Sequence, residues 1–234
     1  MAGHNKWSKI KRQKGANDAK RGAVFTKLGS LIAIAARGGT DPATNSALAM
    51  VVEKAKAANM PNANIQRSID RAKDKNATQL EEVTYEGYGP GGVGLIIEAA
   101  TDNKNRTFPE VRNALTKNGG RIAEPGSVAF QFDRRGVIAV GASGEEALLQ
   151  VLDAGAEDAV EDEGEITVYT AAKDLAKVRE NISASGLDVK DAGLEYVPKN
   201  TVALDDEKSE KILRLLDLID DLDDVINVSS TAEL

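Results

Sequence analysis

Apolar residues in the first third of the chain recur three and four positions apart, which is the spacing of amphipathic helices. The three segments with this pattern are residues 18–36, 41–60 and 62–73. The second helix is expected to begin with Asp41 as its N-cap and Pro42 at its first position. Because the links are short, we predict a small helical bundle. Residues 1–17 lack this periodicity and are interpreted as an extended or disordered tail.

Beyond residue 80 the pattern changes to short alternating segments that are typical of strands, separated by helical segments. Strands are predicted over residues 83–101 (two strands around a Gly/Pro turn), 127–133, 136–142, 158–160, 165–169, 187–196 and 224–230. Helices are predicted over residues 106–120, 145–154, 171–183 and 205–222. Asn105 or Asp102 is expected to cap the first of these helices.

The order of these elements predicts an α+β fold in which one domain is inserted into another. Residues 136–197 form a complete βαββαβ unit of ferredoxin-like character, whereas residues 82–132 lack a helix and a strand. The last thirty residues supply both, because unpaired strands must find a partner. We therefore predict a helical domain with two α/β domains, the third inserted into the second; an uninterrupted row of three domains is the alternative. The expected bounds are residues 1–78, residues 79–134 with 199–234, and residues 135–198.

Basic residues concentrate in the first third of the chain, although the protein as a whole is acidic. The formal net charge is −7 and the sequence pI is about 5.0. Residues 1–75 carry a net charge of +10 and residues 76–234 a net charge of −17. This asymmetry predicts that the first region meets a polyanion and that the acidic remainder has another role.

The composition argues against several classes of function. The chain has no Cys and one His, His4, so thiol chemistry and a serine triad are excluded. No apolar run is long enough to span a membrane, and no secretory signal is recognised, so we expect a soluble, cytoplasmic protein. The acidic run over residues 218–224 is interpreted as a solvated helix end. We expect no enzyme activity, cofactor, metal or small-molecule substrate, and keep a carboxylate/Mg²⁺-dependent hydrolase as a remote alternative.

The basic opening of the chain is the leading candidate for a binding site. Lysine and arginine clusters attract phosphate backbones without reading sequence, and an exposed indole stacks on bases. Trp7 has an alternative role as a packing anchor against the bundle. The candidate nucleic-acid-binding residues are Lys6, Trp7, Lys9, Lys11, Arg12, Lys14, Lys20, Arg21, Lys27 and Arg37.

A second candidate is the glycine-rich stretch "GYGPGGVG" over residues 87–94. It lacks the Lys-Ser/Thr of a phosphate-binding loop and precedes a strand, so we interpret it as a hairpin turn. Its exposed tip is a possible contact with RNA or a partner. The residues of this contact loop are Tyr88, Gly89, Pro90, Gly91 and Gly92.

Six segments together give the chain a specific family resemblance: "MAGHNKWSKIKRQKGANDAKRG", "KAKAANMPNANIQRSI", "YEGYGPGGVG", "TDNKNRT", "GSVAFQF" and "PKNTVAL". In these segments the sequence resembles the YebC family. The resemblance implies three domains, the third inserted in the second, a cytoplasmic location and no established enzymatic activity. Members are labelled probable transcriptional regulators and DNA-binding proteins, others help ribosomes through proline-rich stretches, and mitochondrial relatives activate translation of cytochrome c oxidase. The chain departs from the family in its ending "VINVSSTAEL" and in "AEPGSVAF".

Residues and resemblance together predict a nucleic-acid-binding regulator of gene expression. Its target is either DNA or ribosomal RNA, the ribosome being a possible partner. The third predicted helix interleaves Arg67 and Arg71 with Asp70 and Asp74, so by charge it is a poor reader of the major groove. A lysine-rich tail with one Trp suits irregular RNA at least as well. The alternative is an acidic adaptor that contacts other proteins, with an incidental basic tail.

Overall fold

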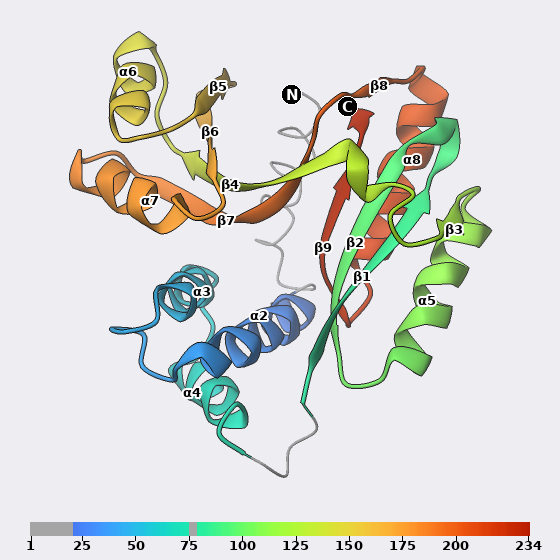
Figure 1. The fold of residues 1–234 in the computed structure, drawn as a ribbon, viewed down its shortest axis with the longest axis horizontal. Helices are drawn as coiled ribbons and strands as arrows, with labels where there is room; N and C mark the ends of the chain where they lie inside the picture. Colours follow the sequence, from blue (N-terminus) through green and yellow to red (C-terminus); the bar gives the residue numbers. More distant parts are fainter. Residues whose placement is uncertain (1–20, 75–78) are drawn as a thin grey trace.

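The computed structural model describes residues 21–74 and 79–234, and Figure 1 shows a helical part below two parts that each contain a sheet. The helical part consists of α2 (Arg21–Ala35), a 3₁₀ turn (Ala36–Gly38), α3 (Ser46–Ala57) and α4 (Asn62–Arg71). Its core joins the three helices through fully or nearly fully buried side chains, among them Ile32, Leu48 and Ile69. The predicted helical bundle is confirmed over these residues.

The predicted start of the second helix is wrong, because α3 begins after Asn45 and not after Asp41. The Asn45 side chain accepts a hydrogen bond from the backbone N–H of Leu48 (3.1 Å) and donates to the carbonyls of Ala35 and Gly39. Asp41 instead accepts from the backbone N–H of Ala43 in a separate turn. Asn45 prevails because it caps α3 and holds the end of the preceding helix at the same time.

One four-stranded antiparallel sheet has the strand order β3-β1-β2-β9. Its members are β1 (Glu81–Tyr88), β2 (Gly94–Thr101), β3 (Arg121–Ala123) and β9 (Val225–Ser230). Helices α5 (Lys104–Lys117) and α8 (Asp206–Asp220) share one hydrophobic core with this sheet, which includes Leu95, Leu115 and Leu215. β9 pairs with β2 although a second sheet separates them in sequence. Two short strands, β8 (Val202–Ala203) before α8 and β10 (Ala232–Glu233) after β9, form a separate parallel pair.

The second sheet is built from a continuous stretch of chain and has the order β5-β6-β4-β7. It contains β4 (Phe132–Val140), β5 (Asp158–Asp162), β6 (Glu165–Ala171) and β7 (Val189–Pro198), with helices α6 (Glu145–Asp153) and α7 (Leu175–Ala184). All three pairings are antiparallel, and β6 lies between β4 and β5, as in the split βαβ units of ferredoxin-like folds. The fold is thus α+β. The residue bounds predicted for the three domains remain a proposal.

The region between β3 and β4 differs from the prediction. The predicted strand over residues 127–133 is a turn followed by a 3₁₀ turn (Ala129–Gln131), and β4 begins only at Phe132. The short strand β3 was not predicted. The reason is Glu86, whose carboxylate accepts hydrogen bonds from the backbone N–H groups of three residues in this segment. Amides that converge on one carboxylate cannot alternate along a strand ladder.

Ion pairs connect the helical part with both sheets. Lys54 of α3 lies 3.0 Å from Asp191 of β7, and Glu53 pairs with Arg179 of α7. Lys27 of α2 pairs with Asp220 at the end of α8. In each pair the two partners come from different parts of the fold, so electrostatics contributes to their mutual placement.

Candidate nucleic-acid interface

The predicted basic site lies only partly within the described residues. Lys6, Trp7, Lys9, Lys11, Arg12, Lys14 and Lys20 fall outside them, so their assignment stays a prediction. Arg21, Lys27 and Arg37 are described, and they are spread along α2 and the 3₁₀ turn that follows it. Arg21 and Arg37 are exposed, and Arg37 also donates a hydrogen bond to the carbonyl of Leu80.

Lys27 has an intramolecular partner. Its ammonium group donates to the backbone carbonyl of Asp220 and lies 3.4 Å from the carboxylate of the same residue. The Lys27 side chain is only 13% exposed. A cation at the C-terminal end of α8 also compensates the partial negative charge of that helix end. Lys27 therefore connects α2 to α8 in this structure, and little of its charge faces solvent.

The acidic run over residues 218–224 is more than the solvated helix end that we expected. Asp220 pairs with Lys27, and the side chain of Asp224 is 13% exposed. Asp224 accepts hydrogen bonds from Thr107 (2.6 Å), Thr101 (3.0 Å) and Arg106 (2.8 Å). Burial raises the pKa of Asp224, but these three donors outweigh it and hold the pKa below its usual value. This carboxylate joins β9 to the start of α5.

The loop that leads into α5 is organised by Asn103, not by either cap that we predicted. The Asn103 side chain accepts hydrogen bonds from the backbone N–H groups of Asn105 and Arg106. Asp102 instead forms an ion pair with Arg106, and Asn105 lies in the first turn of the helix. The "TDNKNRT" segment therefore has a structural role that accounts for most of its polar side chains.

The contact loop of residues 88–92 is a tight hairpin turn between β1 and β2. Gly89 donates to the carbonyl of Val93 (2.8 Å), and Gly92 donates to that of Gly89 (3.2 Å). Gly91 and Gly92 both have φ of +77°, a conformation that favours glycine. A Cβ at Gly89 would lie 2.4 Å from the Ile212 side chain, so the base of the turn packs tightly on α8. The exposed tip, Gly91 and Gly92, is consequently held on a rigid base.

Two cationic residues come from the segment that packs beside this turn. The guanidinium of Arg121 stacks 4.9 Å from the ring centre of Tyr88, whose hydroxyl donates to the carbonyl of Ser127. Lys117 is exposed at the end of α5, two residues before Gly119, where a Cβ would lie 3.6 Å from Pro90. Neither Lys117 nor Arg121 has a carboxylate partner among the described residues. We call Lys117 and Arg121 the turn cations.

Sequence reasoning missed the turn cations, although a signal exists in "KNGGR" (residues 117–121). We predicted only a helix over residues 106–120, which ends at this Gly-Gly pair. The pair also brings the basic residues on either side of it to the contact loop, because Gly120 sits against the Tyr88 carbonyl: a Cβ there would lie 2.7 Å from it. Lys208 of α8 also approaches Gly91, but its ammonium is paired with Asp205.

Phe130 is the most exposed large hydrophobic residue of the described chain, at 68%. A regular strand over residues 127–133 would have placed it on the same face as Val128 and Phe132, which are both buried. The interruption imposed by Glu86 turns it outward instead. Burial raises the pKa of Glu86, and the three backbone donors of Gly126, Val128 and Ala129 reverse that effect and lower it. Glu86 therefore holds the segment as a carboxylate.

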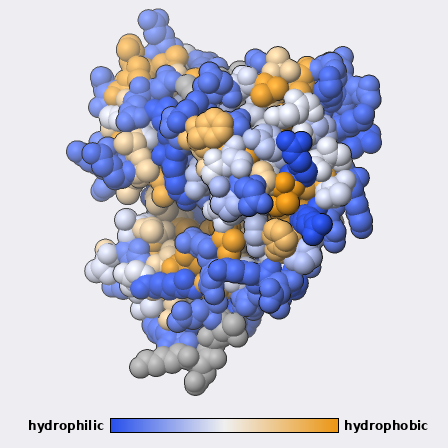
Figure 2. Space-filling view, turned by 45° about the vertical axis from the view of Figure 1, so that its right-hand side comes forward, coloured by the Kyte–Doolittle hydropathy of each residue, from blue (hydrophilic) through white to orange (hydrophobic). Residues whose placement is uncertain are grey.

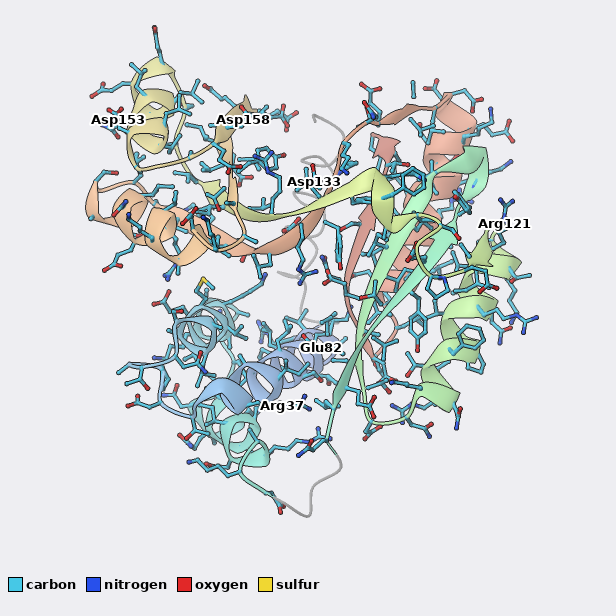
Figure 3. The ribbon with its side chains drawn as sticks, in the orientation of Figure 1. Arg37, Glu82, Arg121, Asp133, Asp153 and Asp158 are labelled. Atoms are coloured by element: carbon cyan, nitrogen blue, oxygen red, sulfur yellow. The ribbon has the colours of Figure 1, made fainter. Side chains whose placement is uncertain are left out.

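The face shown in Figure 2 is mainly hydrophilic, and hydrophobic residues appear on it in separate groups. Arg121 lies at one side of the molecule, whereas Asp153 and Asp158 lie at the opposite side, on the second sheet's part (Figure 3). The described structure thus separates a basic turn from an acidic region. Within the described residues, no helix combines the length and the apolar character needed to cross a membrane.

Comparisons with known proteins agree over the whole chain. Residues 5–75 match the TACO1/YebC protein N-terminal domain, and residues 80–232 match the TACO1/YebC second and third domain. A "probable transcriptional regulatory protein" of Treponema denticola is 48% identical, covering 100% of this chain and 97% of its own length. One with the same description from Latilactobacillus sakei is 45% identical, covering 100% and 98%.

Among solved structures, the chain is similar to the crystal structure of a conserved hypothetical protein from Aquifex aeolicus. The two are 41% identical in sequence and superpose with a TM-score of 0.88, covering 92% of this chain and 91% of the other. The family matches, the similar relatives and the similar fold each extend over nearly the whole chain. It belongs to the TACO1/YebC family.

Proposed function

We propose that this protein is a regulator of gene expression that binds nucleic acid through two surfaces, the basic opening segment and the contact loop with its turn cations. The charge contrast carries the proposal: the first 75 residues have a net charge of +10 in a chain of net charge −7. Such a segment gains affinity for phosphate backbones by releasing counterions. The description of relatives as probable transcriptional regulatory proteins supports nucleic acid as the ligand class.

Structured RNA, such as that of the ribosome, is the target that we favour. A rigid glycine turn with Arg121 and Lys117 beside it is suited to an irregular backbone, and Phe130 and Trp7 offer faces for unpaired bases. Easing translation of proline-rich stretches is the corresponding biological role. A promoter-binding transcriptional regulator is the second candidate, supported by the names of the relatives.

A competition titration separates the two targets. The full-length protein is titrated near 0.15 M salt with ribosomes, with random duplex DNA and with a promoter duplex. Salt at this concentration weakens non-specific attraction to phosphate, and the affinity for random duplex measures what remains of it. We expect ribosome binding to persist and both duplexes to bind weakly and alike. A preference of about a thousandfold for the promoter over random duplex, without ribosome binding, would establish the transcriptional role instead.

Two variants test the surfaces separately. Replacing Lys117 and Arg121 with Ala is expected to flatten the salt dependence of RNA binding by up to about two units of slope. The matched control removes Lys173 and Lys177, two exposed cations of the second sheet's part, and should change little. Equal losses in both variants would mean that the loop has no specific role.

The opening segment is tested with Ala at Lys6, Lys9, Lys11, Arg12 and Lys14. This variant should weaken binding to every nucleic acid, since phosphate contacts carry no sequence information. Trp7→Ala should weaken binding to ribosomes more than to duplex, because duplex bases are already stacked. Unchanged affinity of the five-residue variant for RNA and DNA alike would refute the assignment of this segment.

A further inference from the structure

The outer surface of α6 carries two leucines that the described chain leaves partly exposed. Leu149 is 56% exposed and Leu152 is 44% exposed, and their spacing of three places them side by side on the helix. The opposite side of α6 is already occupied, because Ala147 and Val151 are buried in the core of the second sheet. The helix therefore presents a second, outward apolar strip.

Carboxylates frame this strip. Glu145 and Glu146 begin α6 and Asp153 ends it; all three are exposed, with no cationic partner among the described residues. Between Arg135 and Lys173 the sequence contains no basic residue at all. It contains nine carboxylates there, namely Glu145, Glu146, Asp153, Glu157, Asp158, Glu161, Asp162, Glu163 and Glu165. Figure 3 shows Asp153 and Asp158 on this part of the molecule.

Strand β5 lies next to α6 and forms an edge of the second sheet (Figure 1). It pairs only with β6, so its outer backbone groups have no strand partner in the described chain. The strand sequence is Asp-Ala-Val-Glu-Asp, and such charges protect an edge from pairing with a like-charged strand. The same edge of a second copy would place acid against acid here. A cationic segment would meet no such barrier.

From these observations we propose that the α6–β5 face, defined by Leu149, Leu152 and the carboxylates around them, binds a basic amphipathic segment of a partner protein. Charge complementarity selects the occupant: the face repels nucleic acid, repels the same face of a second copy and attracts lysine and arginine. The two exposed leucines are complementary to an apolar side on the same segment. This apolar contact distinguishes binding at a defined site from diffuse attraction of positive charge. The proposal goes beyond nucleic-acid binding, because this face and Arg121 lie on opposite sides of the molecule.

The test uses a fluorescent lysine/leucine peptide of about 15 residues, patterned as an amphipathic helix, and a scrambled peptide of the same composition. Both are titrated against the full-length protein near 0.15 M salt, with anisotropy as the readout. The amphipathic peptide should bind more tightly than the scrambled one. Replacing Leu149 and Leu152 with Ser should weaken it by roughly tenfold, since its apolar side loses its contact.

The matched control is Leu218→Ser. Leu218 is 47% exposed on α8 and also has acidic neighbours, so this variant removes a similar leucine from a similar charge environment elsewhere. It should leave affinity unchanged. A combined Glu145→Gln, Glu146→Gln and Asp153→Asn variant should weaken binding and reduce its salt dependence.

Three results would overturn the proposal. Equal affinity for the scrambled peptide would show charge attraction alone. Unchanged binding after loss of both leucines, or an equal loss in the Leu218 variant, would place the peptide elsewhere. A dimer in sedimentation that disappears when Leu149 and Leu152 are replaced would show that the face serves self-association instead.

Discussion

The carboxylate of Glu86 offers the sharpest test of how this fold is held together. Its two oxygens accept hydrogen bonds from the backbone N–H groups of Gly126 (2.5 Å), Val128 (2.6 Å) and Ala129 (2.8 Å), and the residue is 8% exposed. Glu86→Gln preserves the shape of the side chain but replaces one oxygen with a donor. We expect the segment around these amides to open more readily.

The size of the effect follows from the three hydrogen bonds. Val128 and Ala129 share one oxygen, so the amide oxygen of Gln retains them at neutral strength, which costs about 1 kcal/mol each. The N–H of Gly126 then faces an amide nitrogen and loses its acceptor, which costs about 1–3 kcal/mol. Relief of the buried charge offsets part of this loss. The net destabilisation of the segment is about 2–4 kcal/mol.

Amide hydrogen exchange measures this destabilisation where it occurs. Opening that is easier by about 2 kcal/mol accelerates exchange at residues 126–129 roughly 30-fold. Glu124→Gln is the control, since Glu124 is exposed in the same segment. Equal protection of residues 126–129 in the wild type and in Glu86→Gln would refute the reasoning.

The pH dependence gives an independent check of the same carboxylate. The pKa of Glu86 is lower in the folded protein than its usual value. Its stabilisation is therefore complete above the unfolded-state pKa and is lost as pH falls through the folded pKa. Protection of residues 126–129, corrected for intrinsic exchange rates, should fall with acid in the wild type. The Gln variant lacks this titration, so the difference between the two proteins should shrink as pH falls.

Two further predictions concern stability. Asp224→Asn should lower the free energy of unfolding by about 1–3 kcal/mol, because Thr107 and the other donors lose a charged acceptor. Thermal denaturation measures the loss, and an unchanged midpoint would contradict the prediction. Gly89→Ala should cost about 1–3 kcal/mol, because its Cβ would meet Ile212 at 2.4 Å. Gly193→Ala meets nothing within 4 Å and is the control; equal shifts in both would argue against overpacking.

The sequence by itself determined the types of most elements. Regular apolar periods predicted the three helices of the bundle, most strands of the two sheets and helices such as α8, because a period reports which side of a regular element is buried. They did not predict β3. The charge contrast and the glycine turn could also be identified from the sequence, since composition and turn-forming residues are local properties. The assignment of the opening segment to nucleic-acid binding came from sequence alone and stays a prediction.

Only the tertiary structure decided what the polar groups do. From the sequence Lys27 was expected to be a surface cation, but in the structure it forms an ion pair with Asp220, which lies far along the chain. Glu86 looked like any strand residue, yet it gathers three amides and turns Phe130 outward. These outcomes depend on contacts between residues that are distant in sequence. A buried charge must find its partners wherever the fold supplies them, and no local pattern of apolar residues records where that is.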